Sequence, residues 1–342
     1  MKRTIEWHNG TVATIDQTKL PNETVILEMK SCNEVAEAIK TMKIRGAPLL
    51  GAAAAFALAL TAYNSQAKSK QELIRELKKS AETLKRTRPT AVNLFWAIDR
   101  ILAKSKSFAG NAEELIAFVV DEARKIADED AAANRLIGKY GAELIRDGDV
   151  ILTHCNAGAL ATVEYGTALG VIRAAWEQRK KIKVIATETR PKLQGARLTT
   201  YELKKEGIPV TLITDGMVGY VMHKQLVNVV VVGADRIVSD AIINKIGTFA
   251  IAVLAKEHQI PFYVAAPKST FDLSRKSAEV VIEERKPEEV TNVGSYRIAP
   301  EGISVLNPAF DITPLDYVTA IICEDGVLHK KDFGKFKANV YK

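Results

Sequence analysis

The sequence predicts an α/β protein, in which a mainly helical domain with a small β cap precedes a domain built on a mostly parallel sheet. Two periodicities support this class. Before about residue 140 most apolar residues recur with a helical period, whereas from Asp149 short apolar segments alternate with helical stretches. Such alternation is typical of βαβ units, whose sheet is covered by helices on both faces. We expect two domains, 1–140 and 141–342, each of ordinary size.

The first domain begins with short alternating segments, for which strands are expected at Thr4–Trp7, Thr11–Ile15 and Thr24–Met29. Helix signals follow, among them a capping residue at Ser31 and a proline at Pro48 that suits a first helical turn. The expected helices are one capped by Ser31 and running through Met42, then Ala47–Ala62, Lys70–Thr87, Ala91–Lys106 and Ala112–Ile145, the last broken near Asp128–Asp130. Because Ala47–Ala62 is too short for a bilayer, we expect a buried helix there.

The second domain contains six apolar segments of strand length, each separated from the next by a longer stretch. This spacing predicts a Rossmann-like sheet of mostly parallel strands. The expected strands are Val150–Thr153, Lys183–Ala186, Val210–Thr214, Val229–Gly233, Phe262–Ala265 and one near Thr319–Cys323.

Composition narrows the classes of function. Of 342 residues, 47% are hydrophobic and 26% charged, so the chain can bury a sizeable core. The net charge is +7, but lysine and arginine alternate with acidic residues along the helices, as on a solvated surface. No basic run is interleaved with aromatic residues, which disfavours nucleic acid as a partner. No Gly-x-Gly-x-x-Gly or Walker loop is present, which disfavours dinucleotides and nucleoside triphosphates.

The cysteines indicate a reducing setting. Cys32, Cys155 and Cys323 lie far apart and match neither a metal-ligand spacing nor a disulfide framework. The segment Met1–Thr11 lacks the apolar core of an export signal. We therefore expect a cytoplasmic protein with no metal site and no membrane segment.

Polar residues follow five of the expected strands where a buried core would not place them. The carboxyl ends of parallel strands meet at one edge of a sheet, which is where open α/β sheets bind ligands. A single aspartate in such a place is more often a helix cap, but five polar ends in succession favour a site. These ends are His154-Cys155-Asn156, Thr187–Arg190, Asp215-Gly216, Asp235-Arg236 and Ala266–Lys268.

Cys155 and Asp235 are the candidates for chemistry at this edge. Asn156–Gly158 is expected to begin a helix, whose dipole would lower the pKa of the Cys155 thiol. Adjacent residues of a strand point to opposite faces, so His154 is not expected to pair with Cys155, which disfavours a Cys-His hydrolase. A thiol and a carboxylate at the carboxyl ends of two strands of one sheet would share one cleft.

Four segments are candidates for binding a phosphate, because each combines a basic side chain with an expected helix start. Each is a weak signal alone, since an arginine near a helix start is common. The segments are Arg45–Pro48, Arg88–Thr90, Arg190–Gly195 and Asn244–Thr248.

Seven segments together resemble the S-methyl-5-thioribose-1-phosphate isomerase family of methionine salvage, which is related to the regulatory subunits of initiation factor two B. The resemblance covers nearly the whole chain, and several motifs in the same order are far more specific than one. The segments are Lys43–Pro48, Arg88–Trp96, Thr153–Gly158, Glu188–Pro191 with Gln194-Gly195, Gly233–Ile237, Asn244–Thr248 and Asn307–Pro314.

The resemblance implies an aldose-ketose isomerase, an intramolecular oxidoreductase that acts on a sugar 1-phosphate without a metal or organic cofactor. It implies that Asp235 is the proton donor for ring opening and that Cys155 assists hydrogen movement between C1 and C2, by an enediol or a hydride shift. A donor acting near neutral pH needs a raised pKa, so Asp235 is expected in a poorly solvated pocket. It also implies a homodimer formed through the Rossmann-like half. The substrate-binding residues implied are Arg45, Gly46, Ala47, Arg88, Gln194, Asn244 and Lys245.

Three functions remain open from the sequence. The first is isomerisation of S-methyl-5-thioribose 1-phosphate, and the second is isomerisation of 5-deoxyribose 1-phosphate or ribose 1,5-bisphosphate by the same chemistry. The third, a regulatory protein without activity, would have no reason to keep both Cys155 and Asp235.

Overall fold

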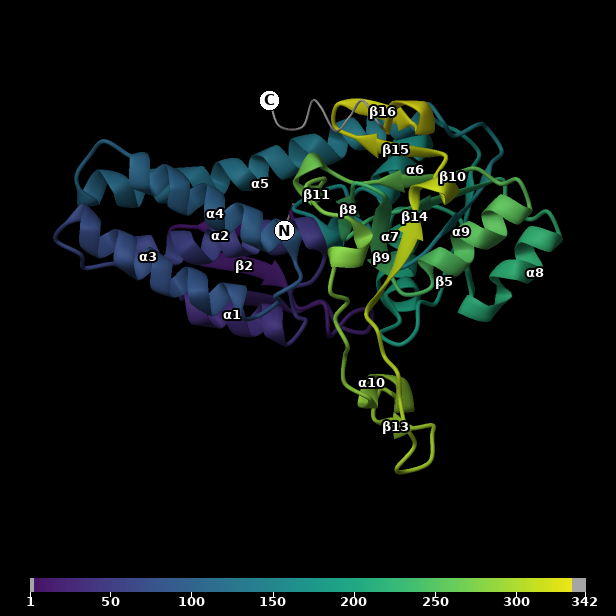
Figure 1. Cartoon of the computed structure of the whole chain (residues 1–342), viewed down its shortest axis with the longest axis horizontal. Coiled ribbons are helices and arrows are strands. Elements are labelled where there is room, and N and C mark those ends of the chain that lie inside the picture. Colours follow the sequence, from purple (N-terminus) through teal and green to yellow (C-terminus); the bar gives the residue numbers. More distant parts are fainter. Residues whose placement is uncertain (1–2, 334–342) are drawn as a thin grey trace. The chain divides into compact units, whose positions relative to one another are not determined.

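The computed structural model describes residues 3–333 and divides into two compact units (Figure 1). The first contains the chain up to Arg135 together with Gly158–Gly166, and the second contains Leu136–Ala157 and the chain from Thr167 onward. The first is mainly helical with a small sheet, and the second is built on a largely parallel sheet. The predicted α/β class is confirmed.

The β cap of the first unit is a three-stranded antiparallel sheet in the order β1-β2-β3. Its strands are β1 (Ile5–His8), β2 (Thr11–Ile15) and β3 (Ile26–Met29). The turn between β1 and β2 consists of Asn9 and Gly10, both with positive φ, as the tightest hairpin turns require.

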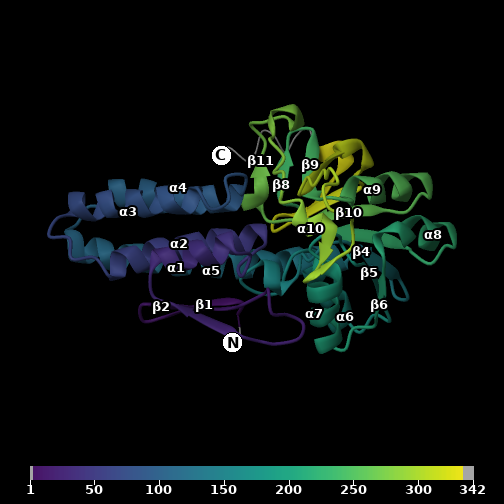
Figure 2. The same ribbon diagram turned by 90° about the horizontal axis from the view of Figure 1, so that it is seen from below.

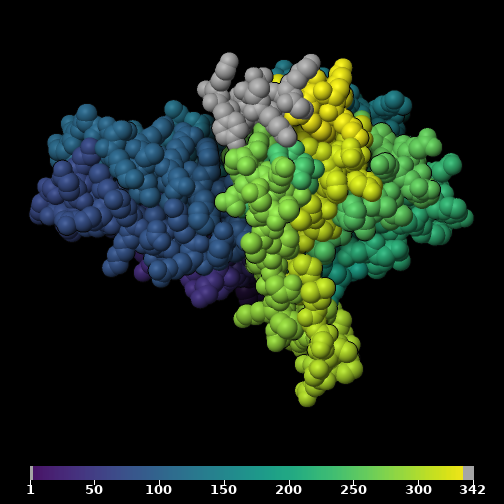
Figure 3. Space-filling view, in the orientation of Figure 1, coloured from purple at the N-terminus to yellow at the C-terminus, as the bar shows by residue number. Residues whose placement is uncertain are grey.

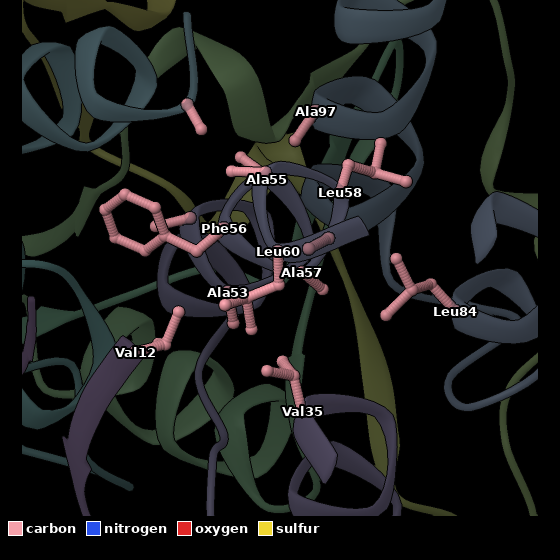
Figure 4. Close-up of a cluster of buried hydrophobic side chains, with 14 of the residues drawn as sticks. Val12, Val35, Ala53, Ala55, Phe56, Ala57, Leu58, Leu60, Leu84 and Ala97 are labelled. Carbon is pink, nitrogen blue, oxygen red and sulfur yellow. The ribbon is translucent and has the colours of Figure 1, made fainter. Parts of the chain in front are cut away.

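A buried alanine-rich helix forms the centre of the first unit. The expected helix at Ala47–Ala62 is α2 (Ala47–Tyr63), which carries a proline in its first turn and is buried along almost its whole length. Its alanines allow the neighbouring helices to approach closely, and Phe56, Leu58 and Leu60 fill the remaining space (Figure 4). The neighbours are α1 (Cys32–Lys40), whose Ser31 and Glu34 form a capping box, α3 (Lys70–Lys85) and α4 (Val92–Ser107).

The long helix α5 (Ala112–Ala142) is continuous, so the predicted break near Asp128–Asp130 is wrong. The acidic side chains there bond to groups outside the helix rather than to its backbone. Asp128 Oδ1 lies 2.5 Å from Arg3 Nη1, and Asp130 Oδ2 accepts a 2.7 Å hydrogen bond from the Val163 amide. Helix signals in the sequence could not reveal these distant partners.

The main sheet of the second unit has seven strands in the order β16-β15-β10-β7-β4-β5-β6. All pairs are parallel except β15 with β16. The chain starts at β4, proceeds outward to β5 and β6, and returns to β7 on the other side of β4, so β4 and β7 flank the point where the strand order reverses. The strands are β4 (Val150–Thr153), β5 (Lys183–Thr187), β6 (Val210–Ile213), β7 (Val229–Val232), β10 (Phe262–Ala265), β15 (Ala320–Cys323) and β16 (Gly326–His329).

Helices cover both faces of this sheet, as predicted. Helix α6 contacts β7 and β10, and α9 also contacts β10. Figure 2 shows α6 and α7 on one side of the strands and α9 on the other. Within residues 3–333, no helix is both long and apolar enough to cross a membrane. These helices are α6 (Ala168–Glu177), α7 (Thr200–Lys205), α8 (Val218–His223) and α9 (Thr248–Glu257).

A second sheet, in the order β11-β8-β9-β14, was not predicted. β8 and β11 have only three and two residues, and β9 and β14 contain polar residues that interrupt an apolar run. Only Ser239 and Asp240 separate β8 from β9. The motif Asn307–Pro314 contributes its edge strand. The strands are β8 (Arg236–Val238), β9 (Ala241–Lys245), β11 (Phe271–Asp272) and β14 (Phe310–Pro314).

Residues 286–306 form an arm that extends away from the rest of the second unit (Figures 1 and 3). The arm contains α10 (Glu288–Thr291), β12 (Asn292–Val293) and β13 (Tyr296–Arg297). Its base is closed by a bridge between Glu284 and Pro308.

Candidate active site

The two predicted catalytic residues lie at the same edge of the main sheet. Strands β4 and β7 are parallel neighbours, with Leu152 opposite Val230. Cys155 follows the carboxyl end of β4, and Asp235 follows the carboxyl end of β7. Both residues are half-buried. Because the strand order reverses between β4 and β7, this is the place where such sheets bind ligands.

A glycine allows the two strand ends to pack closely. A Cβ atom on Gly233, just after β7, would lie 2.6 Å from the Ala157 Cβ atom, a distance that no real side chain tolerates. The segment after β4 therefore lies directly against the end of β7. On the other side, the Asp235 amide donates a 2.9 Å hydrogen bond to the Ile243 carbonyl of β9, which ties the carboxylate-bearing residue to the second sheet.

Cys155 has a strained backbone that threonine side chains hold in place. Its φ of 65° lies in the left-handed region, which costs a residue with a Cβ atom about 1–2 kcal/mol. Its amide donates to Thr189 Oγ1 at 2.9 Å, and its carbonyl accepts from Thr199 Oγ1 at 2.6 Å. Strain of this kind persists only where surrounding contacts impose it, and it is common at functional sites.

The predicted helix at Asn156–Gly158 is absent, so that prediction is wrong. Only a short 3-10 turn follows, at Ala159–Ala161, and the next α-helix begins at Ala168. The segment belongs to the tightly packed turn against Gly233, which the local sequence pattern does not reveal. A helix dipole therefore does not act on the Cys155 thiol from this segment.

Asn156 is anchored by a buried charge network. Its Nδ2 donates to Glu202 Oε1 at 2.8 Å, and the other oxygen of Glu202 accepts from Arg173 Nη2 at 2.6 Å. Burial disfavours the charged guanidinium, but Glu202 and Glu206 hold the pKa of Arg173 above its usual value. The ion pair joins α6 to α7 and fixes the residue that follows Cys155.

His154 is fully engaged and does not serve the thiol as a base. Its Nδ1 lies 2.6 Å from Thr187 Oγ1, and its Nε2 lies 2.9 Å from the Ile246 carbonyl oxygen. Burial lowers the pKa of His154, which favours the neutral ring. Neither ring nitrogen is available to the thiol, in agreement with the prediction that His154 and Cys155 do not form a nucleophile pair.

Gln194 lies in the segment after β5 (Lys183–Thr187), at the start of a helical turn over Gly195–Thr199. A Cβ atom on the following residue, Gly195, would lie 1.7 Å from the Thr187 carbonyl oxygen, so only glycine permits this approach. Gln194 is buried, and its Oε1 accepts no hydrogen bond from residues 3–333. An unsatisfied buried acceptor is costly, and a ligand hydroxyl could satisfy it.

Asn244 and Lys245 end strand β9, and the helix expected to begin there starts later, at Thr248 of α9. Both side chains are buried. Asn244 Nδ2 donates to Thr248 Oγ1 at 3.0 Å, and Lys245 Nζ donates to the Ala309 carbonyl at 2.7 Å. Lys245 Nζ also lies 4.6 Å from the centre of the Phe310 ring.

Asp311 is a polar residue of this region that sequence reasoning missed. It pairs with Asn244 across β9 and β14, and its Oδ2 accepts hydrogen bonds from the amides of Gly247 and Phe249, at 2.7 and 3.1 Å. Burial raises the pKa of Asp311 to about 6, although these amides and Lys245 oppose the shift. Its place in the Asn307–Pro314 motif was the only available signal.

Asp215, another of the polar strand ends, has a structural role. Its two carboxylate oxygens accept hydrogen bonds from the amides of Thr189 and Arg190, at 2.8 and 2.7 Å. It thereby holds the segment after β5 that contains Thr189. This agrees with the reservation that a single strand-end aspartate is more often a cap.

The other predicted binding residues, Arg45, Gly46, Ala47 and Arg88, belong to the first unit, whereas Cys155, Gln194, Asp235, Asn244 and Lys245 belong to the second. Gly46 is the N-cap of α2 with φ 100°, and a Cβ atom there would lie 2.4 Å from the Ala161 Cα atom. Arg45 is buried, and Arg88 Nη1 donates to Met42 Sδ at 3.2 Å. Across residues 3–333, no three acidic, histidine or cysteine side chains form a group able to hold a metal ion.

A protein-family model described as the initiation factor 2 subunit family matches residues 43–330. The chain belongs to the initiation factor 2 subunit family. Within this family, it is 54% identical to a methylthioribose-1-phosphate isomerase from Thermotoga maritima, over 99% of this chain and 97% of that protein.

Two solved structures from archaea are also similar. The 5-methylthioribose 1-phosphate isomerase of Pyrococcus horikoshii is 47% identical, with a TM-score of 0.92 over 99% of this chain and 96% of that one. A structure from A. fulgidus described as translation initiation factor eIF-2B, subunit delta, is 52% identical, with a TM-score of 0.88 over the full length of both chains. Proteins of this similarity to the chain are thus named either as isomerases or as initiation factor subunits.

Asp311 should make stability depend on pH. Its folded pKa is raised above the unfolded value, so the folded protein binds the proton more tightly and loses stability as pH rises from about 4 to 6.5. Relative to Asp311→Asn, the wild-type free energy of unfolding should fall across this window by about 2–3 kcal/mol. Urea unfolding at several pH values measures this difference.

Asp316→Asn is the control, because hydrogen bonding to Lys330 lowers the pKa of Asp316. Relative to Asp316→Asn, the wild-type free energy of unfolding should therefore rise with pH instead of falling. A pH-independent difference between wild type and Asp311→Asn would contradict the assigned shift.

Proposed function

We propose that this chain isomerises S-methyl-5-thio-α-D-ribose 1-phosphate to S-methyl-5-thio-D-ribulose 1-phosphate, a step of methionine salvage. One observation carries the proposal: Cys155 and Asp235 follow neighbouring strands at the reversal of strand order, in a chain that is 54% identical over its length to an isomerase of that name. Its class is aldose-ketose isomerase, an intramolecular oxidoreductase.

The chemistry has two parts. The 1-phosphate locks the sugar as a ring, so the bond between C1 and the ring oxygen must break first, and Asp235 donates the proton that the ring oxygen takes up. The hydrogen on C2 then moves to C1, and the C2 hydroxyl loses its proton to become the ketone. Cys155 assists the hydrogen transfer. Protons gained and lost balance, so the Asp235 carboxylate can recover the proton it gave.

The proposed roles of the binding residues follow from their chemistry. Gln194 offers a buried acceptor oxygen to a sugar hydroxyl, and Asn244 and Lys245 offer donors at the end of β9. Arg45, Gly46, Ala47 and Arg88 are proposed to bind substrate through arginine side chains and the amino terminus of α2, both suited to phosphate. The raised pKa expected of Asp235 stays a prediction.

Two alternatives remain. A preference for 5-deoxyribose 1-phosphate or ribose 1,5-bisphosphate would keep the chemistry and change the pathway, and the bisphosphate would require a second cationic pocket. A regulatory role without activity gains a precedent from the A. fulgidus structure named as an initiation factor subunit. The thiol and carboxylate at adjacent strand ends favour an enzyme over that role.

The purified protein should convert the methylthio sugar phosphate to its ketose faster than it converts 5-deoxyribose 1-phosphate or ribose 1,5-bisphosphate. A parallel assay of ketose formation with the three sugars measures the preference. Preference for another sugar would move the enzyme to a different pathway, and no turnover of any would support the regulatory alternative.

Cys155→Ser and Asp235→Asn should each lower kcat by at least about 100-fold, because each removes a group that acts on the reacting atoms. The fold should persist, since both side chains are half-buried at strand ends. Steady-state kinetics measures the loss, and circular dichroism checks the fold. Cys32→Ser and Asp240→Asn, which change a thiol and a carboxylate elsewhere, are matched controls. Near-normal turnover in Cys155→Ser or Asp235→Asn would remove that residue from the mechanism.

We also propose that the protein is a cytoplasmic homodimer that does not bind nucleic acid, with the dimer formed through the second unit. The arm supports this interface, because five of its large apolar side chains are exposed, and isolated proteins rarely leave such a group uncovered. They are Val293, Tyr296, Ile298, Ile303 and Leu306, the last 82% exposed.

The double variant Tyr296→Glu with Leu306→Glu should therefore be monomeric, because it places two charges on the proposed contact. Light scattering on a sizing column should give twice the 37.5 kDa of one chain for the wild type and one chain mass for the variant. Ile26→Glu, which charges an exposed apolar position of the β cap, should remain dimeric. A monomeric wild type, or a dimeric double variant, would rule this interface out.

A further inference from the structure

We propose that His154 is a positioning residue, which, through Thr187 and Thr189, couples the backbone of Cys155 to the turn between β9 and α9. The kinetic test of this proposal rests on the proposed function, whereas the proposal itself is argued from the geometry of the site. Neither His154 nor the two threonines contacts the reacting atoms in the proposed mechanism.

The coupling starts at the strained residue itself. The Cys155 amide donates to Thr189 Oγ1 at 2.9 Å, and Thr189 Oγ1 lies 3.2 Å from Thr187 Oγ1. Thr187 Oγ1 in turn lies 2.6 Å from His154 Nδ1. All three side chains are at most 2% exposed, so water does not compete for these bonds.

The Ile246 carbonyl fixes the direction of the hydrogen bonds made by His154. The Ile246 carbonyl can only accept, so His154 Nε2 must carry the hydrogen of their 2.9 Å bond. In the neutral ring Nδ1 is then an acceptor, and it receives the Thr187 hydroxyl hydrogen. The Thr187 hydroxyl oxygen can then accept from the Thr189 hydroxyl, which also lies 3.4 Å from the Thr187 carbonyl oxygen. Thr189 Oγ1 accepts from the Cys155 amide in either case. The tautomer of His154 therefore orients the Thr187 hydroxyl.

The turn that His154 contacts follows the proposed binding residues of β9. Ile246 comes directly after Asn244 and Lys245. A Cβ atom on Gly247 would lie 3.1 Å from both Cε1 and Nε2 of His154, so the ring packs against the turn as well as bonding to it. The Gly247 amide is held by Asp311. His154 thus sets the distance between the β4 end, which carries the thiol, and the β9 end, which carries Asn244 and Lys245.

A histidine that only filled the core would affect stability without affecting the reaction. The test is the pair Thr187→Val, which removes the hydroxyl at nearly constant shape, and Thr187→Ser, which keeps it. Thr187→Val should lower kcat by about 10-fold to 100-fold, because a small displacement of a reacting group has effects of this size. KM should stay within about twofold, and Thr187→Ser should restore kcat to within about threefold of wild type.

A second measurement needs no substrate. Cys155 is half-buried whereas Cys32 and Cys323 are buried, so iodoacetamide should alkylate Cys155 first, and peptide mapping identifies the modified residue. Thr187→Val should change the alkylation rate by at least about threefold, and Thr187→Ser should not. Thr313→Val is the matched control, because Thr313 is fully buried and its hydroxyl has no hydrogen-bond partner within residues 3–333. It should leave both kcat and the alkylation rate unchanged.

Unchanged kcat and alkylation rate in a folded Thr187→Val variant would overturn the proposal, as would equal losses in Thr187→Val and Thr187→Ser. If Thr187→Val does not fold, the pair Thr189→Ala and Thr189→Ser tests the next hydroxyl in the hydrogen-bonded series. Equal kcat values and equal alkylation rates in that pair would overturn the proposal. If the wild type converts none of the sugar phosphates, the proposed function fails, and the alkylation rates still test whether the Thr187 hydroxyl, which bonds to His154, positions Cys155.

Discussion

The parallel pairing of β4 with β7 is the constraint on which the rest of the candidate active site depends. These strands are far apart in the chain, and they become neighbours because the chain reverses its direction of progress across the sheet after β6. Open α/β sheets bind their ligands at the carboxyl ends of the strands where such a reversal occurs. The reversal also brings the thiol of Cys155 and the carboxylate of Asp235 to the same edge.

Small residues and buried polar groups then determine the local geometry at this edge. Gly233, Gly195 and Gly247 permit backbone approaches that any Cβ atom would obstruct or strain. The strained backbone of Cys155 is held through both its amide and its carbonyl. Paired buried polar groups of this kind tend to specify one arrangement, because leaving them unpaired is costly. The supports of the site are buried, whereas Cys155 and Asp235 are only half-buried.

The sequence predicted the elements with regular apolar patterns well and the elements without such patterns poorly. Apolar runs such as Val229–Val232 and the helical period of α3 are local signals, and they survive in the structure because burial requires them. In the second sheet, β8 and β11 have only three and two residues, and polar residues interrupt the apolar character of β9 and β14. The expected helix after Cys155 failed because the packing of Ala157 against Gly233, a contact distant in sequence, overrides local preference.

By itself, the sequence determined the α/β class and the family, and it predicted a candidate thiol and carboxylate, because each depends on residue type and local order along the chain. Only the tertiary structure decided that β4 and β7 are neighbours, that His154 is bonded at both nitrogens, and that Asp311 faces Asn244 across two strands. These facts depend on strand order and register between distant segments. A hydrogen-bond partner 92 residues away, as Ile246 is for His154, leaves no mark on the local pattern of the sequence.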